Sequence, residues 1–274
     1  MSLADIAETL EIKSMKVTVC QLDPRTDRSG PLLEALAEHI QQRETDFLLL
    51  PELCFSDWLA DQPPGSDATA RWSRAVADHE SQIEKLDQLG AKAIVGTRPI
   101  VTPENSRRNE AYVWTPDSPS AAGFHQKYYL PDEEGYYEHS WYDRGPKQFE
   151  TARALGMRIG VQICTELWFF EWSRHYAAAR TDILCVPRAT PHGNVEKWIA
   201  GGQAAAVCSG AYCLSSNLWA EPGSGVNLGG GSYIIDPEGQ LLARTDSEHP
   251  FATVEIDLEF ARASKATYPR YVVE

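Results

Sequence analysis

The hydrophobic positions along the chain alternate between the spacing of strands and the spacing of helices. Residues 15–22 follow the two-residue period of a strand, and residues 31–42 place their apolar side chains on one helical stripe. Residues 46–50 form a short apolar run typical of a strand that is buried on both faces. A second helix is expected over residues 72–89, with Gly90 placed where a helix end favours a left-handed residue.

The later part of the chain continues this alternation. Further strands are expected at residues 91–97, 157–163, 183–186, 211–215, 232–235, 241–243 and 252–256, a strand–turn–strand at 109–125, and helices at about 168–179 and 195–209. Between them, residues 128–146 form an aromatic loop of a length that usually has a function. With no linker and no repeat, we expect an N-terminal extension (residues 1–14) and one α/β domain (residues 15–274) with helices on both sides of mixed sheets.

Composition and charge exclude several classes of protein. The 274 residues include 25 Lys and Arg against 39 Asp and Glu, a formal net charge of −14. Nucleic-acid binding needs clustered Lys and Arg, so no nucleic-acid partner is expected. No window has the roughly 18–20 apolar residues of a membrane span, and the first residues lack the basic start and apolar core of a secretory signal. These features predict a cytoplasmic protein that binds no membrane.

The six cysteines do not have the spacing of a metal site. No pair of C-x-x-C motifs occurs, and a protein that is not exported keeps its cysteines as thiols rather than disulfides. Cys208 and Cys213 lie among apolar residues and are expected to be core thiols, as is Cys185 within a strand. Neither a metal nor a cofactor is implied.

Three polar residues directly follow apolar runs, where α/β proteins place their catalytic groups. Glu52 follows residues 47–51, Lys127 follows residues 123–126, and Cys164 follows the strand that begins at Met157. A nucleophile at a strand-to-helix turn is accessible to substrate and close to the N–H groups of the helix start. Each residue alone also has an ordinary structural explanation: a core thiol, a turn cap or a surface charge.

Taken in order, several segments resemble the nitrilase superfamily of carbon–nitrogen hydrolases. The resemblance covers about residues 15 to 257. The segments that carry it are Leu49-Leu50-Pro51-Glu52, His125-Gln126-Lys127-Tyr128-Tyr129-Leu130-Pro131, Gly135-Tyr136-Tyr137-Glu138, Gly160-Val161-Gln162-Ile163-Cys164 and the strand–turn segment 230–239. Any one motif is modest, whereas the ordered set is specific.

The resemblance implies a four-layer α-β-β-α sandwich and a Glu52–Lys127–Cys164 triad, with Glu138 as the family's additional glutamate. In such a triad Glu52 takes the thiol proton and later activates water. Lys127 favours the thiolate and holds the oxyanion of the tetrahedral intermediate, and Glu138 orients Lys127. The backbone N–H of Thr165 is a candidate second oxyanion donor. The expected substrate is a small amide.

The choice of substrate is less defined. Trp58, Trp141 and Trp168 lie close to these motifs and are candidate substrate-binding residues. Arg188 ends a strand and is a candidate for binding a substrate carboxylate, although a structural arginine explains it equally well. The segment after Cys164 lacks the aromatic residue that commonly follows the family's cysteine. An amidase is therefore the main prediction, with a nitrilase or an N-carbamoyl amidase using the same triad as alternatives.

Two readings from other classes remain open at this point. A non-catalytic binding protein on the same scaffold would be expected to lose a triad residue, and none is lost. A cysteine peptidase would need a histidine base, and the candidates are His125, His139, His175 and His192, but no peptidase motif surrounds any cysteine. The family resemblance also implies a homodimer or larger homo-oligomer, with the segment after Ala261 as a candidate interface.

Overall fold

The computed structural model describes residues 14–25 and 29–272, so all but one residue of the expected N-terminal extension lies outside the described residues. The strands are β1 (Ser14–Leu22), β2 (Phe47–Leu49), β3 (Ala93–Val101), β4 (Arg107–Thr115), β5 (Ser118–Gln126), β6 (Ala152–Ala154), β7 (Met157–Val161), β8 (Ile183–Arg188), β9 (Tyr212–Leu218), β10 (Tyr233–Ile235), β11 (Leu241–Arg244) and β12 (Phe251–Asp257). The helices are α1 (Ser29–Arg43), α2 (Ala68–Ile83), α3 (Glu138–Trp141), α4 (Phe170–Ala178), α5 (Val195–Ser209) and α6 (Leu258–Ser264). Four 3₁₀ turns complete the set: η1 (Leu59–Asp61), η2 (Leu86–Leu89), η3 (Cys164–Trp168) and η4 (His192–Asn194).

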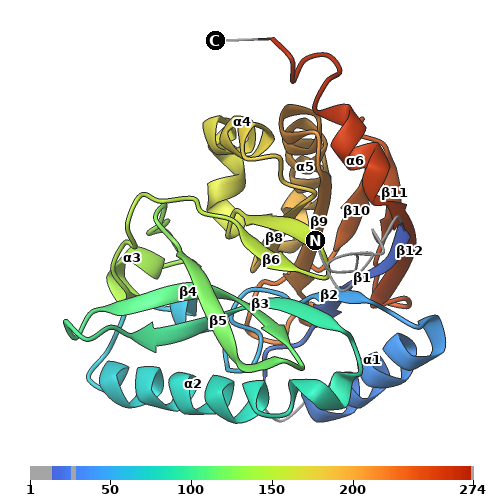
Figure 1. Ribbon diagram of the computed structural model, residues 1–274. Coiled ribbons are helices and arrows are strands. Elements are labelled where there is room, and N and C mark those ends of the chain that lie inside the picture. The colour runs from blue at the N-terminus through green and yellow to red at the C-terminus, as the bar shows by residue number, and fades with distance from the viewer. Residues whose placement is uncertain (1–13, 26–28, 273–274) are drawn as a thin grey trace, which may run out of the picture.

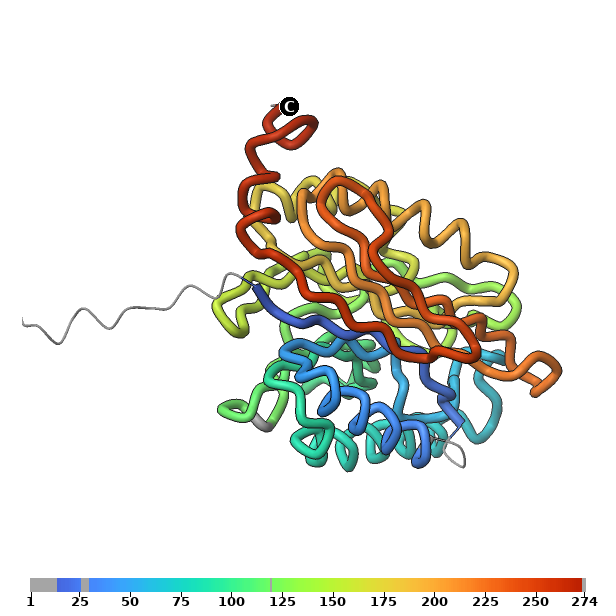
Figure 2. Tube along the Cα trace, turned by 90° about the vertical axis from the view of Figure 1, so that its right-hand side faces the viewer, coloured from blue at the N-terminus to red at the C-terminus, as the bar shows by residue number. Residues whose placement is uncertain are grey.

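Most of the strands form one hydrogen-bonded path that folds back into two facing sheets, and β10, β11 and β12 are joined to it through β9 and β1 (Figure 1). The order along the path is β5-β4-β3-β2-β1-β9-β8-β7-β6. Strand β1 pairs in parallel with β2 and antiparallel with β12, and its end, at Gln21 and Leu22, pairs with β9. Figure 2 shows β12, near the C-terminus, running alongside β1. The sheets are therefore mixed, as the sequence predicts.

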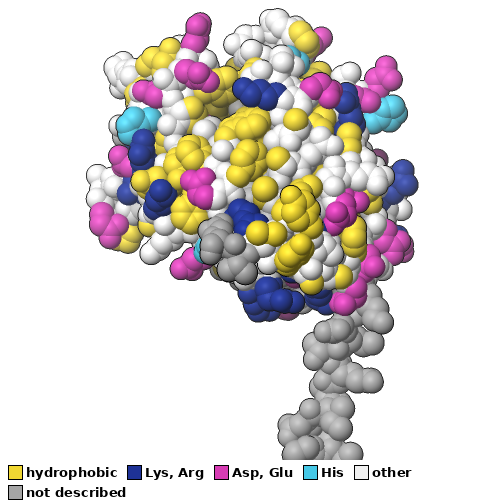
Figure 3. All heavy atoms as spheres, turned by 90° about the horizontal axis from the view of Figure 1, so that it is seen from above, with side chains coloured by type: hydrophobic (Ala, Val, Ile, Leu, Met, Phe, Trp, Pro, Cys, Tyr) yellow, Lys and Arg dark blue, Asp and Glu magenta, His cyan; other side chains and the backbone are white. Residues whose placement is uncertain are grey.

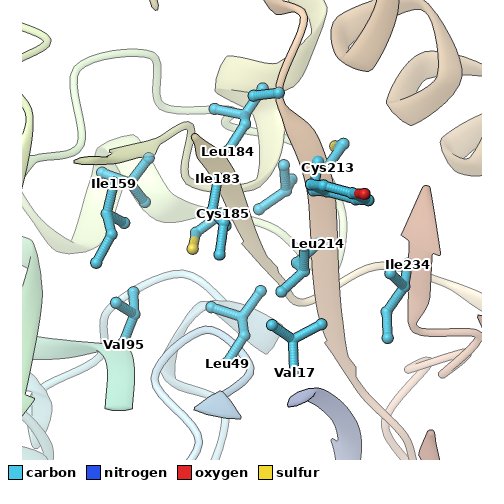
Figure 4. Close-up of a cluster of buried hydrophobic side chains, with 14 of the residues drawn as sticks. Val17, Leu49, Val95, Ile159, Ile183, Leu184, Cys185, Cys213, Leu214 and Ile234 are labelled. Carbon is cyan, nitrogen blue, oxygen red and sulfur yellow. The ribbon is translucent and has the colours of Figure 1, made fainter. Parts of the chain in front are cut away.

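The sheets pack face to face and are covered by helices on their outer sides (Figure 1). Val17, Leu49 and Val95 of the first sheet point toward Ile183 and Leu214 of the second, and all five side chains are fully buried (Figure 4). Helices α1 and α2 cover the first sheet, and α4 and α5 cover the second. The four-layer α-β-β-α sandwich is thus confirmed. No helix within the described ranges is long and apolar enough to cross a membrane.

Local differences from the expected elements have simple causes. The helix expected over residues 72–89 is divided, because α2 ends at Ile83 and a 3₁₀ turn follows. The helix expected to begin at about residue 168 begins at Phe170, because η3 occupies the preceding residues. The short strand β6 and helix α6 were not predicted. Helix α6 is capped by Asp257, whose carboxylate accepts a hydrogen bond from Glu259 N at 2.9 Å.

Candidate active site

The ammonium group of Lys127 is the centre of a buried charge cluster. Its Nζ atom lies 2.7 Å from Glu52 Oε1 and 2.5 Å from Glu138 Oε2, and none of the three side chains is exposed to solvent. Asn109 Nδ2 donates a hydrogen bond to Glu52 Oε1 at 2.8 Å, and the hydroxyl of Tyr142 donates to Glu138 Oε2. Two carboxylates therefore share one cation inside the protein.

Neighbouring elements fix this cluster through the backbone. Lys127 N donates to Asn109 O in β4 at 2.9 Å, and Gly145 N donates to Lys127 O at 2.9 Å. A Cβ atom on Gly145 would lie 2.4 Å from Gln126 O, so only glycine allows the aromatic loop to approach the end of β5 so closely. Within that loop Glu138 begins the single-turn helix α3. The aromatic loop, residues 128–146, thus supplies Glu138, one of the two carboxylates that contact Lys127.

Cys164 is the first residue of η3, at the sharp turn that follows β7. Its φ of +50° lies in the left-handed region, which is unfavourable for a residue with a side chain and recurs at strand-to-helix nucleophile turns. The side chain is 4% exposed, and Sγ lies 4.0 Å from Ala189 O. The charges of Glu52, Lys127 and Glu138 all act on the Cys164 pKa. The structure therefore brings together the four residues that the sequence singled out as a catalytic group.

Burial and charge decide where the protons lie in this group. The pKa of Glu52 is raised to about 7, because burial and the Glu138 charge raise it more than Lys127 lowers it. Burial and the Glu52 carboxylate raise the pKa of the Cys164 thiol. For Lys127 burial favours the neutral form, but Glu138 and Glu52 raise its pKa above the usual value. Cys164 is thus a thiol at rest and Lys127 a cation.

The Lys127 charge lowers the pKa of the Cys164 thiol, but other effects oppose it, so its role in favouring the thiolate stays a prediction. The positive charge of Lys127 is already shared by two carboxylates, and burial outweighs its effect on sulfur. One oxygen of Glu52, Oε2, has no hydrogen-bond partner among the described residues. The Cys164 thiol lies close enough to Glu52 to lower its pKa. A carboxylate oxygen is therefore available to receive the thiol proton.

The histidines do not form a catalytic pair with Cys164. No histidine is among the groups that shift the Cys164 pKa. His125 lies 2.7 Å from Glu166 Oε2 instead, and the ring nitrogens of His175 and His192 lie against backbone carbonyls. The arrangement that a cysteine peptidase would require is therefore not the one that surrounds Cys164.

One of the three candidate tryptophans lines a cavity next to this group. Trp58 and Tyr136 border a cavity of about 400 Å³ together with Glu134. Trp58 Nε1 donates to Gly135 O at 3.0 Å. Burial raises the pKa of Tyr136, and so does the charge of Cys164, which indicates that Tyr136 borders the cavity and also lies near the thiol. The cavity is therefore a candidate entrance for a substrate.

The other two tryptophans have packing roles. Trp141 is buried, donates from Nε1 to Gln62 O at 2.7 Å and lies under the guanidinium of Arg71. Trp168 packs against α5, where a Cβ on Gly201 would lie 2.8 Å from its ring. All three tryptophans lie close to a motif in the sequence, so sequence alone did not separate Trp58, which borders the cavity, from Trp141 and Trp168. The orientation of each ring depends on the residues that pack against it in the fold. As substrate-binding residues both stay predictions, as does half-buried Thr165.

Arg188 is fully buried at the end of β8. Its guanidinium donates to Ser215 Oγ at 2.6 Å, Thr190 Oγ1 at 3.0 Å and Gly231 O at 2.9 Å. Burial lowers its pKa, and the charge of Cys164 raises it. No carboxylate of the described chain pairs with it, so its charge is balanced only by neutral acceptors and by two aromatic rings, one of them Trp198.

Sequence reasoning did not anticipate Asn109, Tyr142 or Tyr136 as parts of the group. Asn109 lies in β4 and is fully buried, so a polar residue at an inward position of a strand was the available signal. Tyr142 and Tyr136 lie in the aromatic loop, whose fold has no periodic signature in the sequence.

Comparison with known proteins agrees with this geometry. A sequence profile described as carbon-nitrogen hydrolase matches residues 16–266. The chain belongs to the carbon–nitrogen hydrolase family. The resemblance to the nitrilase superfamily is thereby confirmed, and the branch stays unassigned.

Several curated relatives of this carbon–nitrogen hydrolase are amidases. The 2-oxoglutaramate amidase of Paenarthrobacter nicotinovorans is 26% identical over 122 residues, 44% of this chain and 41% of that protein. The chloroplastic omega-amidase of Arabidopsis thaliana is 24% identical over 94% of this chain and 72% of its own length. The citrullinase of Francisella tularensis is 28% identical over 46% of this chain and 48% of its own length. Apart from the omega-amidase, the chain matches about half or less of the length of these relatives.

Solved structures share the fold. The NitFhit protein of C. elegans superimposes with a TM-score of 0.80 at 18% identity, over 96% of this chain and 65% of that one. Nit3 of Saccharomyces cerevisiae, a nitrilase superfamily member, gives 0.70 at 18% identity over 94% and 96%. A variant of the Nesterenkonia sp. AN1 amidase, with the acetamide moiety of fluoroacetamide added to its active-site cysteine, gives 0.73 at 20% identity over 92% and 93%.

The charge cluster predicts how stability depends on Lys127. Lys127→Met leaves two buried carboxylates without their cation, so we expect the free energy of unfolding to fall by about 3–5 kcal/mol at pH 8. The loss of stability should be smaller at pH 5.5. Glu52 has a pKa of about 7 even beside Lys127, so at this pH it carries a proton, and only one buried carboxylate charge then lacks its cation. Urea denaturation at the two pH values measures both effects. Lys85→Met, at an exposed lysine, is the control, and an equal loss at both pH values would contradict the prediction.

Proposed function

We propose that this protein hydrolyses small non-peptide amides through a thioester on Cys164 and releases ammonia or an amine. The observation that carries the proposal is the buried Lys127 ammonium held between Glu52 and Glu138, in a group whose charges all act on the Cys164 thiol. Membership of the carbon–nitrogen hydrolase family and the amidase names of several relatives support it.

In the first half of the reaction Glu52 accepts the proton of the Cys164 thiol, and the sulfur attacks the amide carbon. The carbonyl oxygen becomes an oxyanion, which the Lys127 ammonium stabilises, with the N–H of Thr165 as the proposed second donor. Protonated Glu52 then gives its proton to the leaving nitrogen, and the C–N bond breaks. A raised pKa near 7 suits Glu52 for both accepting and returning a proton at neutral pH.

In the second half water replaces the departed amine. Glu52 takes a proton from water, the hydroxide adds to the thioester carbon, and the same oxyanion donors act again. The C–S bond breaks, the sulfur regains a proton, and the carboxylic acid leaves. Glu138 does not exchange a proton in this scheme. Its contact with Lys127, backed by the hydroxyl of Tyr142, keeps the ammonium charged and in place.

A nitrilase or N-carbamoyl amidase would use the same four residues, so the triad alone does not choose among them. The relatives do not choose among them either, because they include a 2-oxoglutaramate amidase and an omega-amidase as well as N-carbamoylputrescine amidases. A non-catalytic binding protein would not need a thiol on a turn with φ of +50° beside a buried base. The covalent adduct on the cysteine of the Nesterenkonia amidase variant is an example of the chemistry proposed.

We further propose a cytoplasmic homodimer or larger homo-oligomer that binds no nucleic acid and no membrane. All six cysteines are free, as suits a reducing compartment.

Figure 3 shows hydrophobic side chains gathered on the face that α4 and α5 present. Tyr268, Tyr271 and Val272 beyond α6 are 72%, 60% and 45% exposed, which favours a partner surface there. Light scattering in solution tests this proposal, and a monomer would contradict it.

The nucleophile is tested by substitution. Cys164→Ala is expected to fold normally and to lower kcat by about a thousandfold or more, because no other group can form the thioester. A panel of small amides and nitriles, with mass spectrometry of the acyl adduct, measures both turnover and the site of attachment. Cys208→Ala, at a half-buried thiol on α5, is the matched control. Turnover that survives in Cys164→Ala would refute the mechanism.

The pKa of the proposed base, Glu52, predicts how activity falls at low pH. Because Glu52 must be ionised to accept the thiol proton, kcat/KM is expected to fall as pH drops below an apparent pKa of about 7. Asn109→Ala removes a hydrogen bond to the ionised form, so it should move this limb to higher pH by up to about one unit. Glu52→Gln should abolish turnover at every pH. A limb that stays in place in Asn109→Ala would assign it to another group.

We also propose that Arg188 gives the enzyme a preference for amides that bear a carboxylate. A buried cation without an anionic partner is costly, and a substrate carboxylate would supply the missing charge. Arg188→Met is then expected to raise KM for carboxylate-bearing amides at least about tenfold more than for neutral amides of the same size. Steady-state kinetics with matched substrate pairs measures the difference. Equal changes for both substrates would leave Arg188 with a structural role.

A further inference from the structure

A second buried ion pair lies beside the proposed catalytic group. Glu166 lies two residues after Cys164 in η3, and its carboxylate is fully buried and accepts three hydrogen bonds. Oε2 accepts from Ile163 N at 2.8 Å and from His125 Nε2 at 2.7 Å, and Oε1 accepts from Tyr128 N at 2.7 Å. The donors are the residue before Cys164 and residues on both sides of Lys127.

The contacts of His125 favour a charged ring. Its Nδ1 lies 3.0 Å from Gln148 O, and a carbonyl oxygen can only accept, so Nδ1 carries a proton. Nε2 faces the Glu166 carboxylate and donates as well. Burial lowers the pKa of His125, but the Glu166 carboxylate outweighs burial and the net shift is upward. His125 and Glu166 therefore form an imidazolium–carboxylate pair that solvent does not reach.

We infer that the His125–Glu166 pair is a positioning device that fixes the Cys164 turn against the Lys127 segment. The inference rests on the proposed catalytic roles of Cys164 and Lys127. Neither His125 nor Glu166 is placed in contact with substrate.

The sheet topology shows why such a device is needed. Lys127 follows β5, an edge strand of the first sheet that pairs with β4, whereas Cys164 follows β7, which pairs with β6 and β8 in the second sheet. No strand pairing joins β5 to β7, so the ladders alone do not fix the distance between their ends. The carboxylate of Glu166 accepts hydrogen bonds from both segments and so fixes their positions relative to each other across the sandwich.

The strained backbone of Cys164 adds a second reason. A φ of +50° persists at a residue with a side chain only where the surroundings determine it. Gln162 Nε2 donates to Glu166 O at 2.8 Å, and Ser173 Oγ donates to Gln162 Oε1 at 2.9 Å, so α4 holds the same turn from the other side. The bond from Ile163 N alone would complete the turn locally. The two further bonds, from residues about 40 positions away in sequence, are those that align it with Lys127.

The test uses two pairs of variants. Glu166→Gln keeps the shape but removes the charge, and His125→Phe keeps a ring but removes both donors. His125→Gln restores one donor to Glu166 and should recover part of the loss. Glu171→Gln, at an exposed glutamate in the next helix, is the matched carboxylate control.

Glu166→Gln and His125→Phe are each expected to lower kcat about 10- to 100-fold with KM changed less than about threefold, because misalignment of reacting groups affects the chemical step. The double variant should lose no more than either single one, since the two residues act as a unit. Urea denaturation confirms that each variant is folded under the assay conditions. A kcat equal to that of the unchanged protein, or a loss confined to KM, would overturn the inference.

A second readout does not depend on turnover. The rate of Cys164 alkylation by iodoacetamide, followed by mass spectrometry, should fall at least about tenfold in Glu166→Gln, because the thiol moves away from Glu52. Equal or faster alkylation would contradict the positioning role. If the unchanged protein hydrolyses no amide or nitrile, the proposed function fails, and the alkylation rates still decide whether the pair positions Cys164.

Discussion

The contact of the Lys127 ammonium with two buried carboxylates is the interaction on which the rest of the site depends. Separating charges from water is costly, so a cluster without solvent contact persists only where opposite charges and hydrogen bonds compensate each other. Glu52 and Glu138 supply the charges, and Asn109 and Tyr142 supply the hydrogen bonds. Two carboxylates around one cation leave a surplus negative charge, which keeps one of them ready to bind a proton.

Burial, together with this surplus, favours a thiol over a thiolate at Cys164. A nucleophile with a lowered pKa would react with any electrophile that reached it. Here burial and Glu52 raise the Cys164 pKa, so the proton leaves only when Glu52 receives it and an acyl carbon is present to be attacked. In the proposed mechanism the same carboxylate returns the proton to the leaving group, which links activation of the thiol to cleavage of the C–N bond.

The four-layer sandwich provides the conditions for such a cluster. Its two sheets bury one another, and the groups that carry charge follow strand ends in different sheets. Water is excluded by the surrounding loops, and the aromatic loop contributes Glu138 and Tyr142 from a single-turn helix. Ladder hydrogen bonds hold each sheet, and at this edge the Glu166 carboxylate adds three hydrogen bonds that join the segment of Cys164 to the segment of Lys127.

The sequence by itself determined the layered α/β fold, because two-residue and helical periods report burial directly. It also determined Glu52, Lys127, Glu138 and Cys164 as a candidate group, since their types and order carry a specific resemblance. It did not determine the ends of α2 and α4 or the existence of β6, where few residues give a weak period.

Only the tertiary structure decided which neighbours act on those residues. Asn109 and Glu166 are ordinary polar residues in the sequence, and their roles arise from contacts with segments tens of residues away. Trp58 and Trp141 are both buried, but Trp58 borders the cavity beside Tyr136 and Trp141 does not line it, a difference that depends on packing rather than on local pattern. The direction of the Cys164 pKa was also decided there, because burial and the distribution of charge exist only in the folded chain.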